Sequence, residues 1–499
     1  MIHNTLAREK QIFTPLNDKV VKAFFCGLTV YDDAHLGHAK AFINFDVAIR
    51  WLRYLGYKVT YIQNITDIDD KIINRARERG IDPTELARQY EKRFMEDLQS
   101  IDARKEIDLL PRSHDYIEII GMQIQMLLDK GYAYMLEGDV YYDVSKFKDY
   151  TKLSGMRIDE LEKHRIEPKE GKRNVYDFAL WKAAKEGEPS WKIKLRYPAT
   201  PTAPPVSASF INPFSRLVGN AYIELDGRPG WHIEDTAITY KEFGPQYDLH
   251  GGASELIFPH HTNEIAQAEA AFGKIPFVKY WMHVGVLTVN GEKMSKSLGN
   301  FVTIRSALEK HRPETLRLLF CTTHYRKEVD YTDASIGEAG KRLGYLYAAL
   351  SLFYNMNETE TGPRDAEIND LAEAFGGEFT AAMNDDFNTP QALGALTTTL
   401  NKLRVFAEKN ESVGRKAKSN MMNIILKFAN ILGTLKDDIY KRPLPKEALR
   451  LIHARGSARE QKKFDESDKL RKQLKDEYNI TVEDSPDGQK WYTNLSART

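Results

Sequence analysis

The chain has 499 residues, with 71 lysines and arginines, 71 aspartates and glutamates, and two cysteines. Two cysteines exclude a disulfide framework, and the sequence has no apolar run of about 18 residues and no apolar targeting segment at its start. We therefore expect a cytoplasmic protein of about three or four domains that binds no membrane. Because the formal net charge is zero, any contact with nucleic acid requires a local basic surface.

The first third of the chain begins with a predicted strand–helix–strand unit. Val20–Phe25 is apolar enough for a buried strand that ends at Gly27, and Lys58–Ile62 predicts the next strand. Between them, apolar residues at helical spacing predict a helix from His38 to a stop at Gly56. The expected buried face of this helix comprises Ala41, Phe42, Phe45, Ile49, Leu52 and Leu55.

Two histidines, His35 and His38, flank Gly37 at the start of this helix. A helix N-terminus has free N–H groups and a partial positive charge, which suit a phosphate group. Gly37 allows a nucleotide to approach the backbone closely. The alternative for this motif alone is a structural helix start with two exposed histidines.

A basic motif, Lys293-Met294-Ser295-Lys296-Ser297, follows a predicted alternating strand, Val284–Val289, and an Asn290-Gly291 turn. Two ammonium groups on such a loop can neutralise charge that develops on a triphosphate as it is displaced. A solvated basic turn is the alternative for this motif alone. The two motifs together, in this order, favour a nucleotidyl-transfer site on a Rossmann-type sheet.

This pair of motifs resembles the signature of class I aminoacyl-tRNA synthetases, and four further stretches resemble cysteinyl-tRNA synthetases. These stretches are Phe25–Asp32, Asn64–Ile73, Gly227–Glu234 and Phe258–Glu264. The resemblance extends over most of the chain. It implies an α/β fold in which a Rossmann-type parallel-sheet catalytic domain carries an inserted connective domain and is followed by a helical-bundle anticodon-binding region.

The resemblance also implies a reaction. L-cysteine is activated with ATP and Mg²⁺ to cysteinyl-adenylate, and the cysteinyl group then passes to the 3′-terminal adenosine of tRNA(Cys). By motif, the catalytic residues are His35, His38, Lys293 and Lys296. The implied ATP-binding residues are Gly37, His38, Gly251, Gly252, Glu255 and Lys296. The implied cysteine-binding residues are Cys26, Gly27, Thr66, Trp231 and His260.

Cysteine differs from serine by one atom, and the family separates them with one bound Zn²⁺, which prefers a thiolate to a hydroxyl. Three of the family's ligands match here: Cys26, His260 and Glu264. The fourth ligand is a cysteine in the family and Asp235 in this chain. Three outcomes remain open: a zinc site with Asp235 as the fourth ligand, a site with altered metal or amino-acid preference, and loss of the metal.

Two smaller departures accompany the exchanged ligand. Leu28 stands where the family usually has proline, and Glu255 ends a Gly251–Glu255 run that ends in aspartate in the family. Leu28 is expected to loosen the turn into the histidine motif. If the acid contacts ribose, the site must accommodate one extra methylene group.

Motif positions predict six regions. They are the first half of the catalytic domain (1–110), a connective insertion (111–225) with a proline-rich extra segment expected as a surface loop (192–226), the second half of the catalytic domain (226–300), a connecting region (301–340), a helical bundle on the anticodon side of the tRNA (341–444) and a small C-terminal domain (445–499).

Two other classes of function remain at this stage. A ligase that joins cysteine to a small amine would not need the helical last third of the chain. A non-catalytic RNA-binding relative would tolerate loss of the histidine and lysine motifs, and both motifs are intact.

Lys296→Ala is expected to abolish most cysteine-dependent ATP–pyrophosphate exchange while the protein stays folded. The reason is the loss of a charge that stabilises the transition state, which is typically about 2–4 kcal/mol and acts mainly on kcat. Exchange near the native rate in this variant would contradict the assignment of the lysine motif.

Overall fold

The computed structural model describes residues 1–156, 170–196, 215–218, 222–295, 298–409, 412–436, 438–485 and 488–495. The chain forms two compact units. The first comprises Met1–Ala34, Leu52–Gln99 and Ala103–Val286, and the second comprises His35–Trp51, Ser100–Asp102 and Leu287–Thr499. The six predicted regions stay a prediction, because the two units divide the chain on a coarser scale.

The first unit contains a parallel sheet of four strands in the order β12-β11-β3-β4. The strands are β3 (Val20–Thr29), β4 (Lys58–Thr66), β11 (Tyr247–Ala253) and β12 (Val278–Val284). The two strands expected on either side of the histidine-motif helix, β3 and β4, are confirmed, but β3 does not end at Gly27. It continues through a register shift between Phe25 and Leu28. A Cβ at position 27 would lie 1.7 Å from the carbonyl oxygen of Asn64, so only glycine permits this close approach.

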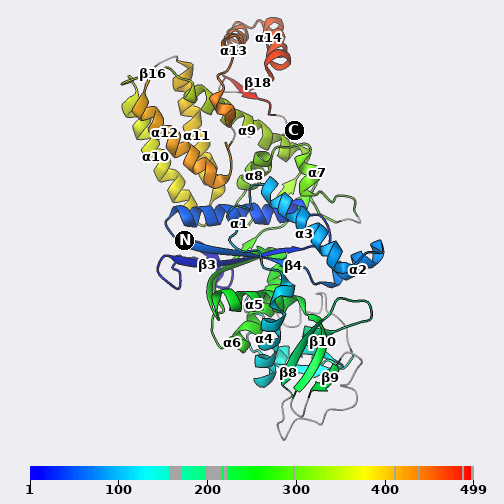
Figure 1. Ribbon diagram of the computed structural model, residues 1–499. Coiled ribbons are helices and arrows are strands. Elements are labelled where there is room, and N and C mark those ends of the chain that lie inside the picture. The colour runs from blue at the N-terminus through cyan, green and yellow to red at the C-terminus, as the bar shows by residue number, and fades with distance from the viewer. Residues whose placement is uncertain are drawn as a thin grey trace. The chain divides into compact units, whose positions relative to one another are not determined.

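Helices α5 (Trp231–Phe243) and α6 (Thr262–Phe272) lie together on one face of this sheet, with α4 (Ile117–Asp129) beside them (Figure 1). Their apolar faces meet the sheet in one buried cluster, where Ile238 and Ile265 of the helices pack with Phe24 and Trp281 of the strands. The carboxyl ends of β3 and β4 and the starts of α5 and α6 supply the polar residues of the site described below.

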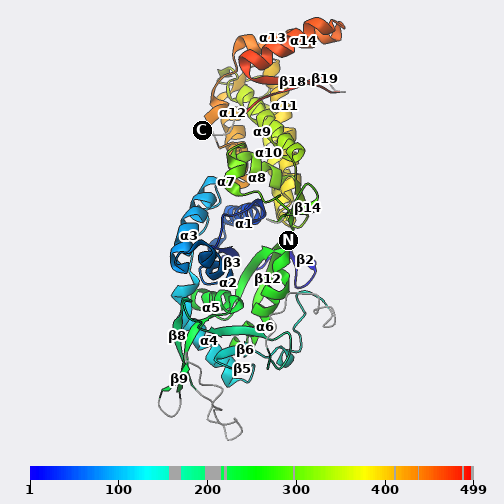
Figure 2. The ribbon, with the colours of Figure 1, turned by 90° about the vertical axis from the view of Figure 1, so that its right-hand side faces the viewer.

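A second, antiparallel sheet of the first unit has the order β5-β6-β7-β10-β8, and β9 pairs with β10. Its strands are β5 (Ala133–Leu136), β6 (Asp139–Tyr142), β7 (Phe178–Ala183), β8 (Trp191–Arg196), β9 (Ser215–Val218) and β10 (Tyr222–Pro229). Figure 2 shows α4 against β8 of this sheet.

The segment 192–226 was expected as a surface loop, and this is wrong at both ends. Residues 192–196 belong to β8 and residues 222–226 to β10, which pair in antiparallel register. Ile193, Leu195, Ile223 and Leu225 are buried at alternate positions, so the period-2 pattern of these short runs outweighs the prolines between them. Residues 197–214 and 219–221 lie outside the described residues.

The second unit is mainly helical. Its first helix is α1 (Leu36–Tyr54), which matches the expected helix and is followed by Gly56 at φ +86°. Leu55 is 42% exposed, so its place on the buried face was wrong: the helix ends one residue earlier. The longer helices that follow are α8 (Pro313–Cys321), α9 (Asp333–Tyr354), α10 (Asp365–Asn384), α11 (Thr389–Glu408) and α12 (Arg415–Leu432).

The predicted strand Val284–Val289 is two strands in the structure. β12 ends at Val284 in the parallel sheet, and β13 (Leu287–Val289) pairs with β14 (Glu292–Lys293) and β15 (Val329–Tyr331) of the second unit. The expected turn is confirmed, because Asn290 and Gly291 both have positive φ between antiparallel β13 and β14. Alternation alone does not show where one sheet ends and another begins.

The last part of the second unit pairs two helices with a hairpin (Figure 2). Helices α13 (Lys446–Glu460) and α14 (Phe464–Tyr478) pack with β18 (Ile480–Ser485) and β19 (Gly488–Thr493) around Trp491. No described helix is long and apolar enough to cross a membrane.

A fully buried arginine connects three helices of the second unit. Arg317 on α8 forms an ion pair with Asp46 on α1 and donates from Nε to the carbonyl oxygen of Leu432 on α12, at 3.0 Å. It also donates to the carbonyl oxygen of Ile101, at 3.0 Å. A buried charge is tolerated only when it is paired and hydrogen-bonded, so these contacts must form together.

Arg317→Met is expected to lower the free energy of unfolding by about 3–5 kcal/mol, because it leaves a buried carboxylate and two carbonyl groups without this donor. Urea denaturation measures the change. Arg450→Met is the control: its exposed pair with Glu447 should contribute about 0–1 kcal/mol. Equal effects of the two substitutions would contradict the structural role of Arg317.

Candidate functional site

The histidine motif lies at the start of α1 in the second unit. The rings of His35 and His38 stack with centroids 3.6 Å apart, and the backbone N–H of each donates to Nδ1 of the other, at 3.2 and 3.3 Å. A Cβ on Gly37 would come within 2.9 Å of the His35 ring. Glycine is therefore needed for the stacking of the two rings, in addition to any approach by a nucleotide.

The chain after the lysine motif runs beside the histidines. The Leu36 N–H donates to the carbonyl oxygen of Val302, at 3.0 Å, and the backbones of His35 and Thr303 pair in an isolated antiparallel β-bridge. Lys293 is exposed on β14. Lys296 and Ser297 lie outside the described residues. The structure thus brings the histidine motif and the flanks of the lysine motif together, as the pairing of the motifs predicted.

Three of the expected ATP-binding residues lie at the end of β11 in the first unit. Gly251 and Gly252 are buried, and a Cβ would lie 2.3 Å from the Met282 carbonyl oxygen at the first and 2.8 Å from the His261 ring at the second. Glu255 is exposed. The two glycines are explained by close packing within the unit, which the sequence alone did not indicate.

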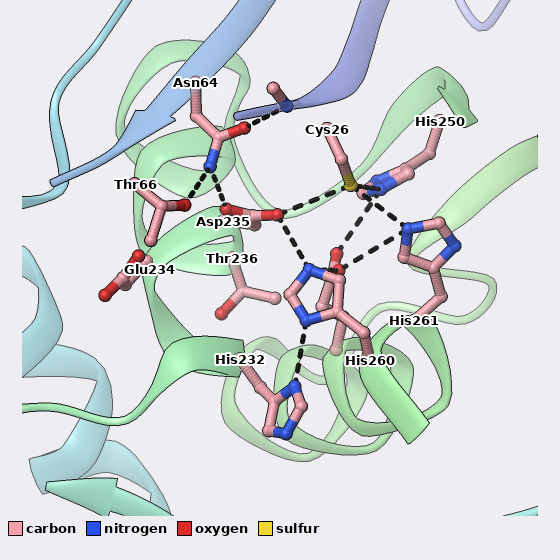
Figure 3. A network of polar contacts seen from close by, with 12 residues as sticks. Cys26, Asn64, Thr66, His232, Glu234, Asp235, Thr236, His250, His260 and His261 are labelled. Atoms are coloured by element: carbon pink, nitrogen blue, oxygen red, sulfur yellow. Dashed lines mark hydrogen bonds and ion pairs between the residues drawn. The ribbon is translucent and has the colours of Figure 1, made fainter. Parts of the chain in front are cut away.

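The four expected metal ligands converge in the first unit. Figure 3 shows three of them, Cys26, Asp235 and His260, around one centre. Cys26, Asp235, His260 and Glu264 each offer a donor atom, and all four atoms lie within 4.8 Å of one another. Asp235 Oδ2 is 3.6 Å from Cys26 Sγ and 3.1 Å from His260 Nε2, which is 3.1 Å from Glu264 Oε1. His260 and Glu264 are four residues apart in the sequence, and their side chains meet on the same side of this segment.

A second set of donors overlaps with the first. His250 and His261 replace Asp235 and His260 in a group that keeps Cys26 and Glu264. His261 Nε2 lies 3.1 Å and His250 Nε2 3.6 Å from Cys26 Sγ. The cluster therefore contains six donors around one centre rather than four.

Each histidine of the cluster is held by a contact on the side of its ring that faces away from the centre. In each case Nε2 faces the centre and Nδ1 contacts a further residue: His260 contacts His232, His261 contacts His283, and His250 contacts Tyr247. The distances are 2.9, 2.8 and 2.5 Å. This arrangement is typical of histidines that bind metals, because the outer contact fixes the ring and its tautomer.

The acidic groups buried at the centre favour a bound cation. Burial, followed by the nearby Asp235, raises the pKa of Glu264 well above its ordinary value, and burial, Asp235 and Glu264 raise the pKa of the Cys26 thiol. Both carboxylate oxygens of Glu264 are buried and accept no hydrogen bond within the described part of the chain. A divalent cation would remove this cost, since it stabilises the thiolate and both carboxylates together.

The expected cysteine-binding residues adjoin this cluster. The Trp231 ring stacks on His260, with centroids 4.1 Å apart and planes 15° apart. Thr66 and Gly27 reach the cluster through Asn64, whose side chain contacts both of them and Asp235. These residues therefore lie around one centre, and their role in cysteine binding stays a prediction.

Sequence reasoning missed the parts of the site that come from distant residues. Asn64 and His261 lie within the family-like stretches and His250 lies outside them, and the motifs placed none of the three at the metal centre. The one available signal was composition, because five of the 13 histidines fall between positions 232 and 283. The order of the strands decides which of them meet.

Comparison with known proteins identifies the family of the chain. Residues 12–196 and 225–341 match the family described as tRNA synthetases class I (C) catalytic domain. Residues 378–436 match a DALR domain, and residues 441–491 match the cysteinyl-tRNA ligase anticodon-binding domain. The chain belongs to the cysteinyl-tRNA ligase family. It is 42% identical to the cysteine–tRNA ligase of Thermococcus gammatolerans and 40% identical to that of Aquifex aeolicus, in each case over 98% of both chains.

Solved structures support the fold of this family member. The methionyl-tRNA synthetase of Mycobacterium tuberculosis, in complex with methionyl-adenylate, superposes with a TM-score of 0.55 at 15% identity. The match covers 96% of this chain and 99% of that one. At this identity the likeness shows a shared class I architecture and nothing about the substrate.

Proposed function

We propose that the chain attaches L-cysteine to tRNA(Cys), through a cysteinyl-adenylate made from ATP. The observation that carries the proposal is the buried group of one thiol, one imidazole and two carboxylates in a member of this family. Such a group can hold a cation that binds the sulfur of the substrate. The matches to the DALR and anticodon-binding domains favour tRNA over a small amine as acceptor.

Zinc would be held by Cys26, Asp235, His260 and Glu264 and would supply a preference for the thiolate of cysteine over the hydroxyl of serine. This set is favoured over the one with His250 and His261 for two reasons. It contains three potential anions rather than two, and Trp231 and Thr66 border it directly or through Asn64. Aspartate is a harder ligand than cysteine, so we expect a less thiophilic centre than that of the family.

The remaining residues would bind and orient ATP. The N–H groups at the start of α1 and the rings of His35 and His38 suit the phosphates, and Lys293 and Lys296 would neutralise the leaving pyrophosphate. Gly251, Gly252 and Glu255 are proposed for the nucleoside, with Mg²⁺ bound to the triphosphate. The carboxylate of cysteine would attack the α-phosphorus, and the adenylate would then pass its cysteinyl group to the terminal adenosine. A cytoplasmic location stays a prediction.

The native protein is expected to contain one zinc per chain and to catalyse ATP–pyrophosphate exchange with cysteine but not with serine. Asp235→Ala should lower the metal content and raise the KM for cysteine, because one anionic ligand is lost. Asp235→Cys should retain the metal, since a thiolate replaces a carboxylate. Elemental analysis and exchange assays on the same preparations measure both effects.

His261→Ala is the matched control. If the second donor set holds the metal, this variant loses it and Asp235→Ala retains it, which would contradict the proposed ligand set. Metal-free native protein that charges tRNA with cysteine and rejects serine would contradict the zinc site as a whole.

The tRNA is proposed to contact the lysines of α14 and of the turn before it. Lys462, Lys463, Lys469 and Lys472 are exposed there. Changing all four to glutamine should raise the KM for tRNA and make it less sensitive to salt, because fewer counterions are released on binding. Pyrophosphate exchange without tRNA should not change. The control changes four exposed lysines of the first unit: Lys58, Lys105, Lys185 and Lys274. Equal effects of the two sets would contradict a specific contact.

A further inference from the structure

The side chain of Asn64 is buried at the end of β4 and makes three hydrogen bonds. Its Oδ1 accepts from the backbone N–H of Gly27, at 2.7 Å. Its Nδ2 donates to Asp235 Oδ1, at 2.6 Å, and to Thr66 Oγ1, at 3.3 Å. The backbone N–H of Gly27 can only donate, so it fixes which end of the amide is the oxygen, and the NH₂ group must face Asp235.

The hydrogen bond from Asn64 gives the two carboxylate oxygens of Asp235 different partners. Oδ1 is taken up by Asn64, while Oδ2 faces Cys26 Sγ and His260 Nε2. A free carboxylate can bind a cation through one oxygen or through both. With Oδ1 occupied by a donor, Asp235 presents a single atom to the centre, as the sulfur of a cysteine would.

We propose that Asn64 is a positioning residue that holds Asp235 as a one-oxygen ligand of the metal. The inference rests on the proposed function, because it assumes that Asp235 is a ligand. Held in this way, Asp235 takes one coordination position, as a cysteine would, and a position stays open for the sulfur of the substrate. The same hydrogen bond draws charge from the carboxylate and makes it a weaker donor to the metal.

The test is a double-mutant cycle between positions 64 and 235. Four proteins are compared: native, Asn64→Ala, Asp235→Cys and the double variant. Asn64→Ala should weaken Zn²⁺ binding by about 10- to 100-fold when residue 235 is aspartate, which is typical for the loss of a contact behind a ligand. In the Asp235→Cys background it should have little effect, because a thiolate has no second oxygen to hold. Competition with a chromogenic chelator gives the dissociation constants.

Cobalt provides a readout that does not depend on activity. Co²⁺ replaces Zn²⁺, and its visible bands weaken when a fifth ligand atom binds. The bands of the Asn64→Ala protein should weaken relative to the native protein, and addition of L-cysteine should change them less. In the Asp235→Cys pair the two spectra should coincide.

The cycle also separates a positioning role from a structural one. Loss of the contact with Gly27 occurs in both backgrounds and cancels in the comparison. An equal loss of metal affinity in both backgrounds would overturn the proposal. If Asn64→Ala does not fold, Asn64→Ser takes its place in the same cycle.

Failure of the proposed function gives a different result. In that case Asp235→Ala binds Zn²⁺ as tightly as the native protein, whatever residue stands at position 64. If Asp235→Ala loses the metal but the cycle shows no coupling between positions 64 and 235, Asp235 is a ligand and Asn64 does not position it.

Discussion

The buried acidic centre is the constraint on which the rest of the first unit depends. Cys26, Asp235 and Glu264 come from a strand and two helices, and no lysine or arginine among the described residues forms an ion pair with either carboxylate. Bringing three such groups out of water is costly unless a cation joins them. Binding of a cation would therefore be coupled to correct packing of α5 and α6 on the sheet, and the histidines around the centre would contribute to both.

The exchange of a cysteine for Asp235 changes the chemistry of the centre more than its charge. The formal charge is the same with either anion, so the fold tolerates both. Softness differs, because a carboxylate oxygen competes less well for zinc than sulfur does. An oxygen-rich centre would hold hard cations comparatively better, and its selectivity among metals would depend more on the geometry of the surrounding side chains.

Much of this architecture follows from the sequence, and the exceptions have physical causes. The strand–helix–strand unit and the Asn290-Gly291 turn were correct because local periodicity and turn chemistry determine them. The end of β3 was wrong because Gly27 serves a close backbone approach that only the paired strand reveals. The alternation of Val284–Val289 predicts one strand where the structure has two, because alternation carries no information on which sheet each half joins. At the site, the expected ligands meet. The presence of Asn64 and His250 beside them could not be predicted, because it depends on which strands are neighbours in the sheet.

The second unit is built from segments far apart in the sequence, and this has a consequence for synthesis of the protein. Residues 35–51 leave the ribosome early, but their partners lie far downstream. Asp46 forms an ion pair with Arg317. Trp51 packs against Phe379 and donates a hydrogen bond to the side chain of Asn384. At about 5–20 residues per second, roughly 20–80 s pass before the chain as far as α12 has been made. During this interval the apolar and charged face of α1 lacks its native partners. Helix α1 therefore reaches its native packing only after these distant parts of the second unit have been made.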